Sequence, residues 1–252
     1  MGVTQFADLT EQEFIHKALN DDLSKSQKGL DIERIEVPGT PPASVDWRGK
    51  GVITPVYDQG DCGSSWTFSA TGTMESVLAV KNKTLYNFSK QQLLDCCTYA
   101  KYGCEGCKGA FPDWALDYVR DAGIVLDSEY PFTTWKDDCK PIPTARKLLN
   151  HTKPWSMIVN NTVNIKNALN QFGPLSVSVD AYKWQFYVSG VFNDCHDDHV
   201  TTASLLVGYQ EDGAWILRNS WGTTWGEQGY IRVANKSDCC LIKTHVVIPH
   251  FA

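Results

Sequence analysis

The hydrophobic pattern of this chain changes partway along its length, and this change limits the folds open to it. In the first half, apolar residues recur at helical spacing, as Ala70, Met74, Val77 and Leu78 do after residue 65. In the second half, short stretches alternate or are rich in β-branched and aromatic residues, at 175–179, 204–209, 214–217 and 230–233. Helices that come first and strands that come later predict an α+β fold with two lobes.

The overall composition argues against several classes of protein. The chain has 252 residues, enough for one large domain or two small ones around a sizeable core. Its net charge of -6 argues against nucleic acid as a partner, because a surface that binds nucleic acid is normally basic. No apolar run approaches the roughly 18 residues that a membrane span needs, so no membrane partner is expected. The first six residues lack the basic end and apolar stretch of a signal peptide.

The cysteines and the glycosylation sequons indicate where the protein resides. Nine cysteines suit an oxidising compartment better than the cytosol. Asn-x-Ser/Thr sequons support the same interpretation, and there are five, at Asn82, Asn87, Asn150, Asn160 and Asn235. The expected location is therefore secreted or endolysosomal, including vacuolar.

Residues 1–41 differ from the rest of the chain. They contain no cysteine, and the Pro/Gly-rich stretch over residues 37–42 cannot continue a helix or a central strand, which predicts a linker. Thr10 and Glu13 have the spacing of a capping box, so a short helix is expected over residues 11–19. A disordered N-terminal tail is the alternative.

One motif is more specific than any other, Gln59-Gly60-Asp61-Cys62-Gly63-Ser64-Ser65-Trp66. It resembles the nucleophile segment of the papain family of cysteine proteases, in which Cys-Gly-Ser or Cys-Gly-Ala precedes a catalytic cysteine and an aromatic residue. The resemblance is to the cathepsin L- and cathepsin B-like members of that family. Other segments resemble the family in its own order: Asp58-Gln59-Gly60, Gln92-Leu93-Leu94-Asp95-Cys96, Gly106-Cys107-Lys108-Gly109, Gly173-Pro174, Val207-Gly208-Tyr209, and Asn219-Ser220-Trp221-Gly222 with Trp225-Gly226.

The resemblance implies a papain-like two-lobe fold, with a helical left lobe and a β-barrel-like right lobe. Residues 42–252 would form the papain-like domain, with the left lobe over 53–155 and the right lobe over 156–252 plus the start of the domain. Residues 1–41 resemble the C-terminal part of the inhibitory prosegment and its linker. This prosegment remnant is expected in the cleft as the chain's own partner.

A papain-like site needs a thiolate, an imidazole and an oxyanion hole, and no cofactor or metal. By resemblance, Gln59 matches the oxyanion-hole glutamine, Asn219 the asparagine that orients the imidazole, and Trp221 the indole that shelters this asparagine. Ser65 stands at the nucleophile position. Its hydroxyl is hardly ionised at physiological pH and needs a base to become a nucleophile.

The position of the catalytic histidine is held by Thr202. In the family this histidine lies five residues before the valine that corresponds to Val207, and a count from Cys195 with cathepsin L spacing gives the same position. Threonine has no titratable nitrogen and cannot be a general base near pH 7. His199 is the alternative base, but an offset of three residues in a strand normally points a side chain to the opposite face.

The resemblance also implies the walls of a ligand cleft. Trp66 follows the nucleophile position, and Gly109 with Ala110 replaces the family's Gly-Gly, whose backbone pairs with extended substrate. Val200 and Thr201, which precede the histidine position, complete the predicted cleft.

The family's disulfides imply a pairing for eight of the nine cysteines. They imply Cys62–Cys107, Cys96–Cys139, a small loop like that of cathepsin B closed by Cys97–Cys104, and Cys195 paired with Cys240 or, less favoured, with Cys239. A zinc site is the alternative, because Cys104-Glu105-Gly106-Cys107 has C-x-x-C spacing.

The loss of both nucleophile and base favours a pseudoprotease that binds a peptide, a cystatin-like inhibitor or another protein. One alternative is a weak serine-type peptidase that uses Ser65 with His199. Another is an inactivated form of a cysteine endopeptidase, and a structural or storage protein is the third.

Overall fold

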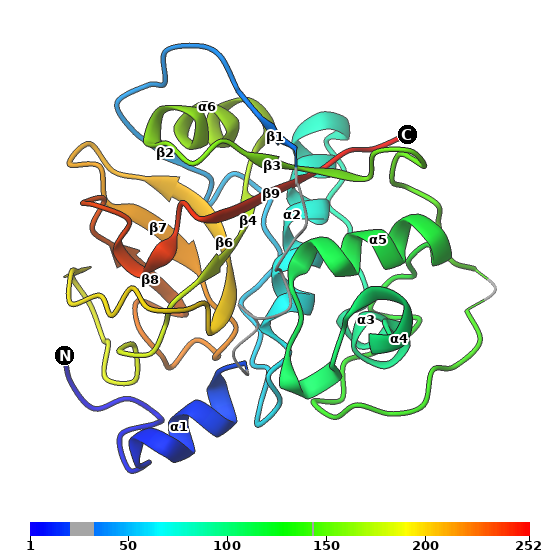
Figure 1. The fold of residues 1–252 in the computed structure, drawn as a ribbon, viewed down its shortest axis with the longest axis horizontal. Helices are drawn as coiled ribbons and strands as arrows, with labels where there is room; N and C mark the ends of the chain where they lie inside the picture. Colours follow the sequence, from blue (N-terminus) through cyan, green and yellow to red (C-terminus); the bar gives the residue numbers. More distant parts are fainter. Residues whose placement is uncertain (21–32, 143) are drawn as a thin grey trace.

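Helices and strands occupy different halves of the molecule. The computed structural model describes residues 1–20, 33–142 and 144–252. Four helices gather on one side, α2 (Ser65–Asn82), α3 (Lys90–Cys96), α4 (Tyr99–Tyr102) and α5 (Pro112–Ala122), while the sheet and α6 (Thr162–Phe172) lie on the other (Figure 1). Short 3₁₀ turns cover Gly106–Lys108 and Cys239–Leu241. The α+β two-lobe fold expected from the sequence is confirmed.

The described strands form one sheet. They are β1 (Arg34–Ile35), β2 (Val45–Asp46), β3 (Trp155–Ile158), β4 (Leu175–Val179), β5 (Val191–Phe192), β6 (Thr202–Tyr209), β7 (Trp215–Arg218), β8 (Tyr230–Val233) and β9 (His245–Pro249). Their order is β1-β3-β9-β4-β6-β7-β8-β5, with β2 paired to β6 beside this path. Every residue of β4, β6 and β7 is buried, because these strands are covered on both faces.

Helix α2 runs between the two lobes and packs against β6 and β4. All of its residues from Ser65 to Ala79 are buried, so it has no solvent-exposed face along most of its length. At Gly72 a Cβ would lie 2.5 Å from the guanidinium of Arg218 and 3.3 Å from Leu205, so glycine allows close approach to the sheet. None of the described helices, α2 included, is long and apolar enough to cross a membrane.

Each lobe has its own hydrophobic core. The left-lobe core contains Trp66, Met74 and Phe88, and the right-lobe core contains a group of buried tryptophans that includes Trp184 and Trp225. Three buried residues of the N-terminal segment, defined here as residues 1–20, belong to the right-lobe core: Phe14, Ala18 and Leu19. The segment is therefore packed as part of the fold.

The N-terminal segment forms the predicted helix, α1 (Glu11–Ala18). The capping box is present, since Thr10 Oγ1 accepts the N–H of Glu13 at 3.3 Å and the Glu13 carboxylate accepts the N–H of Thr10 at 2.8 Å. Described residues 1–20 are thus ordered, in contrast to the alternative of a disordered tail. The prosegment prediction also covers residues 21–32, which lie outside the described residues.

Four disulfides join the described cysteines. In the left lobe they are Cys62–Cys107, Cys96–Cys139 and Cys97–Cys104, the pairs that the resemblance implies, and they use both cysteines of the alternative zinc spacing. In the right lobe Cys195 pairs with Cys239 in place of the favoured Cys240. The backbone of Cys240 is left-handed (φ 56°), which turns its thiol toward the indole of Trp184 and leaves Cys239 to meet Cys195.

Candidate functional site

Ser65 begins α2 at the boundary between the lobes. Its hydroxyl is buried, accepts the backbone N–H of Ala203 at 3.1 Å, and lies 3.5 Å from Oδ1 of Asn20. Ala203 belongs to β6 and Asn20 to the N-terminal segment. The predicted nucleophile position therefore lies where both lobes and the N-terminal segment meet.

Gln59 is buried beside this position. Its Oε1 accepts the hydroxyl of Ser220 at 2.6 Å, and its Nε2 donates to the carbonyls of Cys62 at 2.9 Å and Ala18 at 3.2 Å. An oxyanion-hole amide acts by donating to an oxygen that gains negative charge. The resemblance assigns this donor role to the side-chain amide of Gln59, and here the amide donates to the carbonyl of Ala18 in the N-terminal segment.

Thr202 and Asn219 occupy one face of the sheet. Thr202 is the first residue of β6, and Asn219 directly follows β7. Because Leu205 pairs with Arg218, the alternation of side chains places residues 202, 204 and 219 on the same face. The buried Thr202 Oγ1, Ser204 Oγ and Asn219 Nδ2 have no hydrogen-bond partner among the described residues. The predicted histidine and asparagine positions therefore share no side-chain hydrogen bond.

Trp221 anchors the N-terminal segment through its ring and its nitrogen. Its ring centroid lies 5.4 Å from that of Phe6 and 5.5 Å from that of Phe14, both in edge-on contact. Its Nε1 donates to the carbonyl of Ala18 at 3.3 Å. The Ala18 carbonyl thus receives two side-chain donors, from Trp221 and Gln59.

Asn20 is a site residue that sequence reasoning missed. Its N–H donates to the carbonyl of Thr201 at 2.6 Å, and its buried side chain lies over Ser65. A Cβ on Gly109 would lie 2.7 Å from the Asn20 Cβ, and one on Gly63 would lie 3.0 Å from the carbonyl of Leu19, so glycine permits this close contact. The only sequence signal was the predicted helix, whose end places Asn20 next to the site.

The predicted cleft residues separate into two groups. Gly109 and Thr201 contact Asn20. Trp66, Ala110 and Val200 are buried in the left-lobe core, and Trp66 Nε1 donates to a backbone carbonyl at 3.1 Å. The second group therefore contributes to the packing of the left-lobe core.

No histidine bonds to Ser65 in residues 1–20, 33–142 and 144–252. The side chain of His199, the alternative base, is 32% exposed, and its Nδ1 lies 3.2 Å from the carboxylate of Asp198. Three other histidines have polar partners elsewhere: His196 with Asp180, His245 with Asp113, and His250 with Ser156. These four imidazoles thus have polar partners other than the candidate nucleophile.

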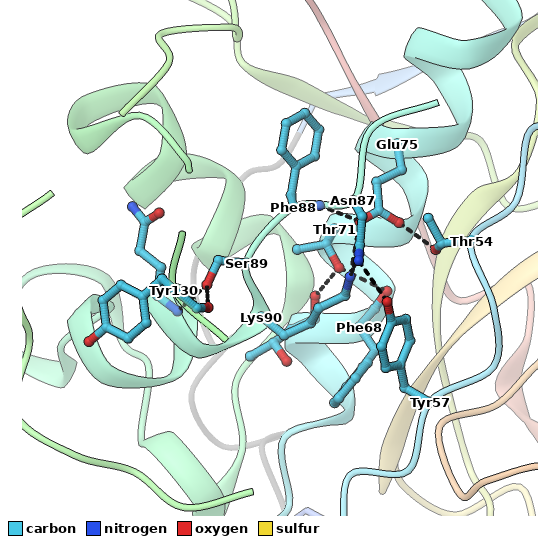
Figure 2. A network of polar contacts seen from close by, with 12 residues as sticks. Thr54, Tyr57, Phe68, Thr71, Glu75, Asn87, Phe88, Ser89, Lys90 and Tyr130 are labelled. Carbon is cyan, nitrogen blue, oxygen red and sulfur yellow. Dashed lines mark hydrogen bonds and ion pairs between the residues drawn. The ribbon is translucent and has the colours of Figure 1, made fainter. Parts of the chain in front are cut away.

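A buried polar network holds the chain that leads to Gln59. Glu75 and Lys90 form a fully buried ion pair at 3.1 Å (Figure 2). Glu75 also accepts the hydroxyl of Thr54 at 2.6 Å, and Lys90 Nζ lies 4.5 Å from the ring centroid of Tyr57. Burial raises the pKa of Tyr57, so its hydroxyl stays neutral. Thr54 and Tyr57 are thereby fixed just before the site.

Comparisons with known proteins agree with this fold. The family model described as papain family cysteine protease matches residues 41–250. A cathepsin L-like peptidase of Aedes aegypti is 38% identical, and the match covers 99% of this chain and 78% of the relative. A cathepsin L-like proteinase of Phaedon cochleariae is 35% identical, and the match covers 94% of this chain and 74% of the relative. The structure of digestive procathepsin L 3 of Tenebrio molitor larval midgut has a TM-score of 0.83 at 33% identity, and covers 99% of this chain and 82% of its own. The proform of the ragweed pollen cysteine protease Amb a 11 has a TM-score of 0.87 at 29% identity, and the match covers 99% of this chain and 81% of that protein. This chain belongs to the papain family of cysteine proteases.

Proposed function

We propose that this chain is a non-catalytic member of its family, a pseudoprotease whose cleft binds without cleaving. The observation that carries the proposal is the surroundings of Ser65, whose hydroxyl meets Asn20 and Ala203 and, among the described residues, no imidazole. A serine needs a neighbouring general base to become nucleophilic. Thr202 at the histidine position supplies no such base.

The size of the expected loss of turnover supports the same proposal. Removing one catalytic group from a serine protease lowers turnover by about 10⁴–10⁶-fold. This chain departs from the family at two such positions, Ser65 and Thr202. One such departure would already remove most of the activity. A serine introduced only to keep a proform intact would therefore not need a second change at Thr202, so the two departures together favour a natural loss of catalysis.

The N-terminal segment supports a role as the cleft's own ligand. Gln59 and Trp221 donate to the carbonyl of Ala18, and Thr201 accepts the N–H of Asn20. Two of the similar solved structures are described as a procathepsin and a proform. A chain without self-cleavage keeps its segment. When the segment is displaced, the cleft would accept an extended peptide or a cystatin-like inhibitor, because neither needs a thiol to bind.

The disulfides support residence in an oxidising compartment. Four pairs use eight of the nine cysteines. Disulfides of this density persist outside the reducing cytosol. We therefore propose that the protein resides in the secretory or endolysosomal route.

Peptidase assays test the proposal. The wild type should not cleave fluorogenic peptides before or after proteolytic removal of the N-terminal segment, and Ser65→Ala should behave identically. Ser65→Cys combined with Thr202→His should gain cleavage, since Gln59 and Asn219 remain. Ser65→Cys alone should stay at least about 10²-fold weaker, because it lacks the acid–base group. Wild-type turnover that Ser65→Ala abolishes would establish a serine-type peptidase and end the proposal.

A further inference from the structure

Three sulfur atoms lie together in the right lobe. Cys195 and Cys239 form a disulfide, and the free thiol of Cys240 has its Sγ 3.0 Å from Sγ of Cys195. All three Sγ atoms lie within 4.8 Å of one another. Two of these sulfurs are bonded to each other in the disulfide, so the cluster in this state does not offer three thiolates to a metal ion. A thiol in contact with a disulfide sulfur is instead arranged for thiol–disulfide exchange.

We propose that Cys240 competes with Cys239 for Cys195, so that this disulfide exists in two interconverting isomers. In the exchange, the Cys240 thiol gives up its proton and its sulfur forms a bond to Sγ of Cys195. The bond between Cys195 and Cys239 breaks, and Cys239 leaves as a thiolate that takes up a proton. One disulfide and one thiol are present before and after, so no oxidant or reductant is consumed.

The surroundings of Cys240 make this exchange slow at neutral pH. The residue is 1% exposed, and burial raises the pKa of its thiol to about 12. The indole N–H of Trp184 donates to its Sγ at 3.4 Å. Because the thiolate is the attacking species, the rate should rise about tenfold for each pH unit below that pKa.

The exchange acts on the wall of the cleft from two sides. Cys195 begins the stretch that reaches Thr201, whose carbonyl binds the N–H of Asn20. Trp184, whose indole N–H donates to Cys240 in the isomer described, has its ring centroid 6.3 Å from that of Trp221. The choice of disulfide partner therefore bears on the site that the N-terminal segment covers, whether or not the protein is catalytic.

Mapping of the free thiol in the wild-type protein tests the proposal. Native protein is incubated at neutral pH and at about pH 10, quenched with acid, unfolded and labelled with N-ethylmaleimide. Tandem mass spectrometry then locates the label. We expect it on Cys240 after neutral incubation and shifted in part to Cys239 after the alkaline one. A label confined to Cys240 under both conditions would overturn the proposal.

Matched variants give a second measurement. Cys239→Ser and Cys240→Ser each retain eight of the nine cysteines, and after oxidative folding both should have no free thiol, because either neighbour closes on Cys195. Two free thiols in folded Cys239→Ser beside none in Cys240→Ser would show that Cys240 cannot pair. The double variant controls the labelling, with one free thiol expected at Cys195. If Cys239→Ser does not fold, the wild-type mapping decides.

Discussion

Glu75 and Lys90 bring two opposite charges into the interior, with both side chains 0% exposed. Buried ions lose their hydration, and their attraction offsets this loss only where further hydrogen bonds satisfy them. Glu75 receives the Thr54 hydroxyl and the N–H of Phe88, and Lys90 donates to Asn87. At the scale of the residue, the pair is therefore stable only as a complete network.

Glu75→Gln should lower the free energy of unfolding by about 3–5 kcal/mol, because the Lys90 ammonium remains buried without its counter-charge. Chemical denaturation followed by circular dichroism measures this loss. Lys183→Gln is the matched control, since Lys183 pairs with Asp194 while 40% exposed, and its loss should stay within about 1 kcal/mol. Equal losses in the two variants would contradict this view of the network.

Asn87 is both a member of this network and a glycosylation candidate. Its side-chain nitrogen donates to the hydroxyl of Tyr57 at 2.8 Å and its oxygen accepts from Lys90 (Figure 2). A glycan on that nitrogen would displace Tyr57. Glycopeptide mapping of protein from a secretory host should find Asn87 unmodified and the exposed Asn82 and Asn160 occupied. Full occupancy at Asn87 in folded protein would rule out this arrangement.

At the scale of the element, α1 depends on tertiary contacts. A helix of eight residues is marginal in water by itself, even with a capping box. Phe14 is fully buried against Trp221, and Gln185 Nε2 donates to the carbonyls of Phe6 and Leu9 at 2.9 and 2.8 Å. The segment therefore stays over the site because the right lobe holds it there.

Phe14→Ala should release this segment, because truncation of a buried phenylalanine costs about 3–5 kcal/mol. Limited proteolysis should cut within residues 1–41 more than about tenfold faster, while the rest of the chain stays resistant. Thr10→Ala removes only the helix cap, at a cost of about 1 kcal/mol, and should speed cleavage less. An unchanged cleavage rate in Phe14→Ala would mean that other contacts retain the segment.

At the scale of the whole molecule, a buried contact joins the two lobes. Asp113 of α5 and His245 of β9 lie 2.7 Å apart, and both side chains are 2% exposed. The His245 ring also stacks on Phe111, with centroids 4.7 Å apart. Since α5 lies among the left-lobe helices and β9 lies in the sheet, this contact reports on whether the lobes unfold together.

Asp113→Asn should lower the free energy of unfolding by about 1–3 kcal/mol, because an amide in place of the carboxylate weakens this buried hydrogen bond. The loss should appear as one cooperative transition in calorimetry. Asp117→Asn on the same helix is the control, because its bond to Arg120 is partly exposed and should contribute no more than about 1 kcal/mol. Two separate transitions in Asp113→Asn would show that the lobes unfold independently.

Local patterns predicted the regular elements better than the contacts between them. The helical spacing after residue 65 predicted α2, and Thr10 with Glu13 predicted the start of α1, because both signals lie within one turn or a few turns of chain. The pairing of Cys195 was different. Cys239 and Cys240 are adjacent in sequence, and the left-handed backbone of Cys240 separates their roles.

The sequence by itself determined the family, the order of helices and strands, and the identity of Ser65 and Thr202, because these depend on residue type and spacing along the chain. Only the tertiary structure decided what these positions meet. Asn20 lies over Ser65, the carbonyl of Ala18 takes the amide of Gln59, and Cys239 reaches Cys195, across sequence separations of 45, 41 and 44 residues. Such contacts follow from how the N-terminal segment and the lobes pack together, and no local pattern encodes that packing.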